Sequence, residues 1–226
     1  MTNEKYAKLT TSLIFVWFLF SLTASALHLF NTAPGQPPLP LGLSVLMPIV
    51  IIAVWSAASQ PFRQFLLSLN PRTLTFVQAW RIAGFVFLVL YTYNILPGQL
   101  ALPAGWGDIA IGATAPLVAF KFANSRYRKS FIVWQLLGIT DLVSAVGLGV
   151  TAQLNPHAIA TSAMTVLPMS VIPTFAVPLF MILHLNQHRP SSPVGGAAVS
   201  ACWRATAINR RVNRPGPQAA VFLCST

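Results

Sequence analysis

Six apolar runs occupy most of the first 188 residues of this chain, and the gaps between them are too short for a soluble domain. An α-helix needs about 20 apolar residues to cross the hydrocarbon core of a bilayer. The runs therefore predict an all-α membrane protein, in which residues 1–188 form a transmembrane domain of six helices. We place these helices at about 9–30, 41–58, 74–96, 105–120, 130–152 and 166–185.

The composition excludes an ordinary soluble protein. Charged residues make up 8% of the chain, against about 25% in an average soluble domain. The formal net charge of +11 would suit a nucleic-acid-binding protein. However, the basic residues lie in the gaps between the apolar runs and do not gather on one face, so we expect no nucleic acid as a partner.

The basic residues also predict the orientation in the membrane. Thirteen of the 14 Lys and Arg residues fall before the first run, after the second, after the fourth or after the sixth. The alternate segments, 31–40, 97–104 and 153–165, contain none. Because cytoplasmic loops are enriched in Lys and Arg, we expect both termini on the cytoplasmic side of a bacterial-type inner membrane.

The first run also has features of a secretory signal peptide. Lys5 and Lys8 precede an apolar centre, and Ala24-Ser25-Ala26 matches a small-residue cleavage site. We favour an uncleaved first helix, because the apolar run continues beyond this site and further runs follow. Cleavage after Ala26 would leave five helices with the same orientation.

The sequence also predicts the local structure of two other segments. Residues 60–70 space Phe62, Phe65, Leu66 and Leu69 like one face of a short helix in the membrane interface, although an ordinary loop is an equal alternative. The sixth run contains prolines at 168, 173 and 178. Each proline removes a backbone donor, so this helix should be bent or locally unwound.

The tail over residues 189–226 is rich in Pro, Gly, Ala, Ser and Arg and has no periodicity. Such a composition predicts a disordered basic segment, whose arginines could contact anionic lipid. Cys202 and Cys224 both lie in this tail, and their spacing indicates neither a metal site nor a disulfide framework.

Three charged residues fall inside apolar runs: Arg81, Asp108 and Asp141. A charged residue at the centre of a membrane helix costs about 2.5–3.5 kcal/mol, so each of them needs an explanation. At 1.5 Å per residue, Asp108 lies about 20 Å from the inner face, Asp141 about 18 Å and the Arg81 backbone about 13 Å. The long arginine side chain can rise to the level of the carboxylates, and we predict that the three form an intramembrane polar core.

Small residues accompany these charges. Glycines at such spacings allow helix backbones to approach closely in lipid. We therefore expect the third, fourth and fifth helices to pack around the polar core through Gly84, Gly105, Gly107, Gly112 and Gly138.

The polar core admits three interpretations. In the structural one, which we favour, Arg81 binds one or both carboxylates and pins three helices together. In the second, an acid near the midplane binds and releases a proton in a small proton-coupled or polar-solute transporter. The third is enzymatic and is the least favoured, so we assign no catalytic residue, metal ligand or cofactor.

The enzymatic interpretation rests on Gly105-Trp106-Gly107-Asp108, which matches the pattern GxGD. This pattern resembles the motif of the intramembrane aspartyl proteases, the presenilin-like and prepilin-peptidase-like families, and implies two carboxylates that share a proton and activate water. The chain departs from those families, because their partner aspartate precedes the GxGD helix whereas Asp141 follows it. It also lacks a Pro-Ala-Leu segment.

A second resemblance adds a location but no mechanism. Residues 78–84 and 103–108 resemble segments of bacterial multi-pass inner-membrane proteins that carry no assigned function, and the likeness covers most of residues 70–150.

The histidines are weaker candidates for a functional site, as ligands of a metal or haem. His28 and His157 both fall near the predicted outer face and could share a metal. His184 and His188 lie one turn apart at the inner end of the sixth run, where such a pair can bind metal or haem. We expect instead that this pair anchors the helix in the interface.

Overall fold

Helices account for every regular element in the part of the chain that the computed structural model describes, residues 3–122, 127–155 and 161–187. The predicted all-α class is therefore confirmed. The chain divides into two units, Met1–Arg189 and Pro190–Thr226, and all described residues belong to the first. The predicted disordered tail, with its two cysteines, lies outside the described residues.

Among the described residues, four helices are long and apolar enough to cross a membrane, with mean hydropathies of 1.7 to 2.2. They are α1 (Asn3–Ala26), α2 (Leu39–Ala58), the continuous helix Pro71–Thr92 and α7 (Arg128–Leu154). They correspond to the first, second, third and fifth predicted runs. The first helix ends at Ala26 and not near Phe30, because the chain turns at His28, whose φ is 56°.

The third run is not uniform. It consists of α4 (Pro71–Val77), the 3₁₀ segment η1 (Gln78–Gly84) and α5 (Phe85–Thr92). A 3₁₀ helix is narrower than an α-helix and is rarely longer than a few residues. Here it lies against α6 so closely that a Cβ on Gly112 would overlap the backbone at Arg81 and Ile82.

The fourth run begins earlier than predicted. We expected a loop over 97–104, but α6 spans Gly98–Leu117 and contains Pro103. Burial explains the difference, because Leu100, Ala101 and Ala104 pack in an apolar cluster with Phe87 and Leu96. This packing offsets the hydrogen bond that Pro103 cannot make. The π-helical segment η2 (Val118–Phe122) extends the same helix at its other end.

The sixth run is broken, as its prolines predict. After the 3₁₀ segment η4 (Thr161–Thr165), residues 166–171 are mostly turns, and the π-helical segment η5 (Ile172–Ala176) leads into α8 (Val177–Gln187). The apolar helix Ile172–Gln187 is thus shorter than the predicted span over 166–185.

One freed carbonyl joins the broken helix to α1. In a regular α-helix the N–H of residue 178 would bond to the carbonyl of Thr174, but Pro178 has no N–H. The Thr174 oxygen instead accepts hydrogen bonds from Trp17 Nε1 at 3.2 Å and from Ser21 Oγ at 3.4 Å.

The segment over 60–70 forms a helix and not a loop. The element α3 (Gln60–Ser68) begins at Ser59, whose side chain accepts a hydrogen bond from Phe62 N at 3.4 Å. Its apolar face packs against the protein itself, with the Trp55 and Phe62 rings stacked at 4.0 Å between centroids. The same cluster contains Tyr6, Phe65 and Leu66.

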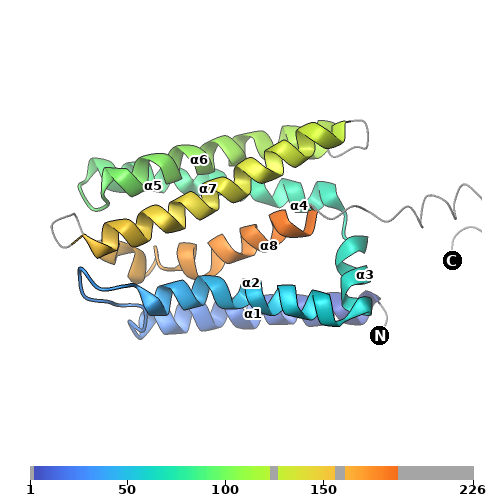
Figure 1. Ribbon diagram of the computed structural model, residues 1–226, viewed down its shortest axis with the longest axis horizontal. Coiled ribbons are helices and arrows are strands. Elements are labelled where there is room, and N and C mark those ends of the chain that lie inside the picture. Colours follow the sequence, from blue (N-terminus) through green and yellow to red (C-terminus); the bar gives the residue numbers. More distant parts are fainter. Residues whose placement is uncertain (1–2, 123–126, 156–160, 188–226) are drawn as a thin grey trace, which may run out of the picture. The chain divides into compact units, whose positions relative to one another are not determined.

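Figure 1 shows that the long helices run side by side, with α8 lying between the α1–α2 pair and the group formed by α4 to α7. The η1 segment packs on α6, and α6 packs on α7. The three segments that carry Arg81, Asp108 and Asp141 are therefore neighbours.

Candidate functional site

The side chains of Arg81, Asp108 and Asp141 meet in one cluster. Arg81 Nε donates to Asp108 Oδ1 at 2.7 Å, and Arg81 Nη2 donates to Asp141 Oδ2. One guanidinium thus joins η1, α6 and α7. Arg81 therefore binds both aspartates and not only one of them.

The third guanidinium nitrogen is also occupied. Arg81 Nη1 donates to the Gly138 carbonyl oxygen at 3.3 Å and lies 3.3 Å from His184 Nε2. The Arg81 side chain is fully buried, while the side chains of Asp108 and Asp141 are 17% and 13% exposed. The cation is therefore enclosed, and each carboxylate keeps one partly open edge.

His184 continues the network. Because arginine can only donate, Nε2 of His184 must accept the bond from Arg81. Its other ring nitrogen, Nδ1, bonds to Gln135 Oε1, which can only accept. These two bonds together select the neutral imidazole with its proton on Nδ1.

The same chain of hydrogen bonds reaches the ends of α8 and α4. Gln135 Nε2 donates to Gln187 Oε1 at 2.7 Å, and Thr75 Oγ1 lies 2.6 Å from the same oxygen. Four segments, α4, η1, α7 and α8, are thereby linked through polar side chains that are buried or partly buried.

The predicted glycines lie where this network needs space. A Cβ on Gly84 would overlap the Asp108 side chain, one on Gly107 the Asp141 carboxylate, and one on Gly138 the His184 ring. Gly105 faces the Leu88 side chain in the same way. Together with Gly112 against the η1 backbone, these positions hold the helices at a separation that only glycine allows.

The interpretation of His184 as an interfacial anchor was wrong. His184 has no exposed surface and contacts Arg81 and the Trp134 ring, whose centroid is 5.5 Å away. His184 does lie near the end of α8, but its place along the run does not show which way its side chain faces, and it faces Arg81 and Trp134. The signal that could have revealed it was a second polar residue, Gln135, inside the fifth run.

Of the other histidines, His28 does not join this site. His28 is exposed in the turn after α1, and His157 and His188 lie outside the described residues. Within the described ranges, no three His, Cys, Asp or Glu side chains gather as a metal site.

The geometry differs from that of an aspartyl protease dyad. There, two carboxylates face each other, share a proton and activate one water molecule. Here, Asp108 and Asp141 each accept a hydrogen bond from a different nitrogen of Arg81, which lies between them.

Gly107 provides a direct test of the packing. Gly107→Ala should push the Asp141 carboxylate away from Arg81 and lower stability by about 1–3 kcal/mol through overpacking. Gly147→Ala is the matched control on α7, because its Cβ would meet nothing within 4 Å. Thermal unfolding of both variants in detergent should show a lower Tm for the first only. Equal Tm values would contradict the close approach.

Comparison with known proteins gives a family without an assigned activity. Residues 37–187 match the family described as "Domain of unknown function (DUF8737)". No curated protein and no solved structure matches the chain. The matched region contains Arg81, both aspartates and His184, and it covers more than half of the sequence. The chain therefore belongs to the DUF8737 family.

Proposed function

We propose that this protein is a six-span integral protein of a bacterial-type inner membrane, with both termini in the cytoplasm. In this proposal Arg81, Asp108 and Asp141 are a structural lock that fixes how the helices pack. The observation that carries it is the single buried guanidinium bonded to two carboxylates, a backbone carbonyl and His184.

The energetics support a lock. A buried ion pair adds little net stability when compared with apolar packing, but removal of one partner leaves an orphan charge that costs about 3–5 kcal/mol. In lipid, any arrangement that separated Arg81 from Asp108 and Asp141 would be destabilised by this amount. The native packing of η1, α6 and α7 is therefore strongly preferred over alternatives.

Four features support the first helix as a retained span. Trp17 and Ser21 bond to the Thr174 carbonyl, and Ala24 and Ser25, which precede the candidate cleavage point, are buried. A signal peptidase could cleave after Ala26 only if this end of α1 first left these contacts.

Substitution of Arg81 tests the lock. Arg81→Gln leaves two carboxylates without a cation and should lower Tm in detergent by about 10 °C, from a loss of about 3–5 kcal/mol. Asp108→Asn and Asp141→Asn each keep a balanced ion pair and should lower Tm by a smaller amount, about 3–6 °C.

Arg63→Gln is the matched control. Arg63 is an exposed arginine whose side chain bonds to Gln60 at 2.8 Å. Its loss should change stability by less than about 0.5 kcal/mol. If Arg81→Gln were as stable as Arg63→Gln, the structural role would be refuted.

Thiol labelling tests the proposed topology. Gln36 lies exposed between α1 and α2, in a segment without Lys or Arg. In intact spheroplasts, a membrane-impermeant maleimide should label a Gln36→Cys variant at residue 36 but leave Cys202 and Cys224 unlabelled until the membrane is opened. The intact mass should include residues 1–26. Labelling of the tail cysteines in closed spheroplasts would reverse the orientation.

Proton-coupled transport is the second candidate, and the charge balance of the cluster favours it. Arg81 supplies one positive charge, whereas two ionised aspartates supply two negative ones. The other Lys and Arg residues among the described ones lie outside the apolar runs. An uncompensated charge is costly in lipid, and a proton bound to either carboxyl group would remove it.

Flux measurements test this candidate. Proteoliposomes that contain a pH-sensitive dye should acidify when a proton gradient is imposed, and Asp141→Asn should abolish the response while Arg63→Gln preserves it. A wild-type rate equal to that of empty liposomes would exclude proton transport and leave the structural role untouched.

A further inference from the structure

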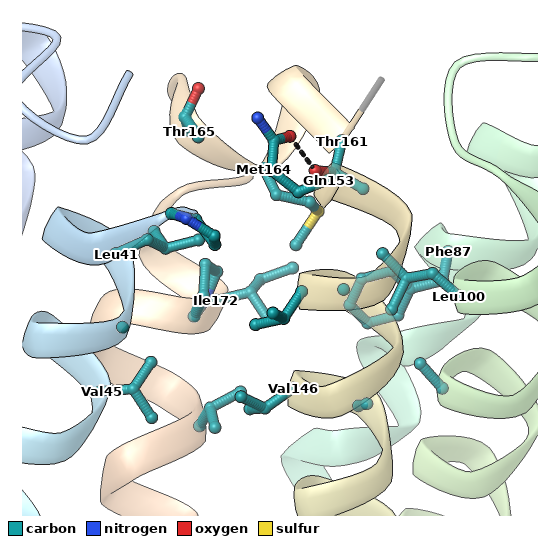
Figure 2. Close-up of a pocket in the computed structure, with 18 residues that line it drawn as sticks. Leu41, Val45, Phe87, Leu100, Val146, Gln153, Thr161, Met164, Thr165 and Ile172 are labelled. Carbon is teal, nitrogen blue, oxygen red and sulfur yellow. Dashed lines mark hydrogen bonds between the residues drawn. The ribbon is translucent and has the colours of Figure 1, made fainter. Parts of the chain in front are cut away.

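An apolar cavity of about 90 Å³ lies outside the charged cluster, between α2, α6, α7 and the broken sixth run. Figure 2 shows its walls, with Val45 and Leu41 on one side, Phe87 and Leu100 on the other, and Ile172 between them. None of the residues that line it is charged. An apolar lining of this kind favours apolar ligands over water.

Two glycines keep the cavity open. Gly42 on α2 and Gly149 on α7 both line it. A Cβ at Gly42 would meet nothing within 4 Å, and one at Gly149 would meet only Leu100 at 3.9 Å. Neither glycine is required for close helix contact, in contrast to those around Arg81.

The cavity extends along the helix direction. Its lining on α7 runs from Ala145 to Gln153, a distance of about 12 Å at 1.5 Å per residue. This length matches a hydrocarbon chain better than a compact solute. The helices that form the cavity also have apolar outer faces. On α2, for example, the side chains of Leu39 and Leu43 are 67% and 59% exposed.

The polar groups of the lining lie at one end of the cavity (Figure 2), and their donors are already used. Gln153 Nε2 donates to the carbonyls of Thr32 and Ala33 at 3.4 and 3.2 Å. Thr161 Oγ1 donates to Gln153 Oε1 at 2.6 Å. Thr165 Oγ1 donates to Asn31 Oδ1 at 2.7 Å. What remains is acceptor capacity on these side-chain oxygens, which suits a hydroxyl head and offers nothing to a carboxylate.

We propose that this cavity binds the hydrocarbon chain of an uncharged, hydroxyl-bearing lipid, either a long-chain alcohol or a glyceride. The chain lies between α2 and α7, and the hydroxyl group donates to Gln153 Oε1 or Thr161 Oγ1. This site is distinct from the Arg81 cluster and does not depend on the proposed topology, because binding is measurable in detergent.

A photoreactive probe tests the site. Hexadecanol with a diazirine in its chain should label the purified protein at cavity residues, among them Met164 and Val146. Gly149→Leu should weaken this binding roughly a hundredfold, because the new side chain displaces about four methylene groups of the ligand.

Gly147→Leu is the matched control, since Gly147 is on the same helix, has free space at its Cβ and does not line the cavity. Gly42→Leu fills the cavity from the opposite wall and should act like Gly149→Leu. Because Gly42 and Gly149 lie on different helices, a shared loss of labelling in variants that elute as single species reports on the cavity and not on misfolding.

Three labelling outcomes would overturn the proposal. They are labelling spread over the lipid-facing surface, labelling unchanged by both filling variants, and equal labelling by the corresponding diazirine fatty acid. Solvent extraction of purified wild-type protein followed by mass spectrometry separates the two sources, because a bound free alcohol and a bound diacylglycerol differ in mass. Recovery of neither lipid class above the level in Gly149→Leu would also count against it.

Discussion

The packing of this protein depends on one buried guanidinium that satisfies two carboxylates. Arg81 can donate in several directions at once, so a single side chain fixes the relative position of η1, α6 and α7. Through His184 it also fixes α8. In a low-dielectric environment the alternative to this arrangement is a set of unpaired charges, which is why the rest of the packing adjusts to it.

That adjustment is visible in the backbone. The third helix narrows to 3₁₀ geometry over Gln78–Gly84, where it carries Arg81 and meets Gly112. Glycines at 84, 107 and 138 leave room for Asp108, Asp141 and His184. The glycines, by contrast with the charged residues, contribute no bond of their own, and their role is to allow the helices to come close enough for the bonds to form.

The glycines allow helices to pack closely, whereas the prolines of the sixth run interrupt a helix. Pro178 has no N–H to donate to the Thr174 carbonyl, and this oxygen accepts hydrogen bonds from Trp17 and Ser21 of α1. The irregular stretch before Ile172 leaves the apolar cavity between α2 and α7 unfilled. One break in a helix thus provides both an attachment point and a space.

Much of this could be predicted from the sequence, and the physical reason is that hydropathy and helical rise are local. Apolar runs specify helices, and a rise of 1.5 Å per residue places Arg81, Asp108 and Asp141 at comparable depths. The sequence alone could not show that Arg81 holds both acids, that α6 begins at Gly98, or that His184 joins the cluster. Those outcomes depend on how helices rotate and where the sixth run breaks. Only contacts between residues as distant as Arg81 and His184, 103 positions apart, decide them.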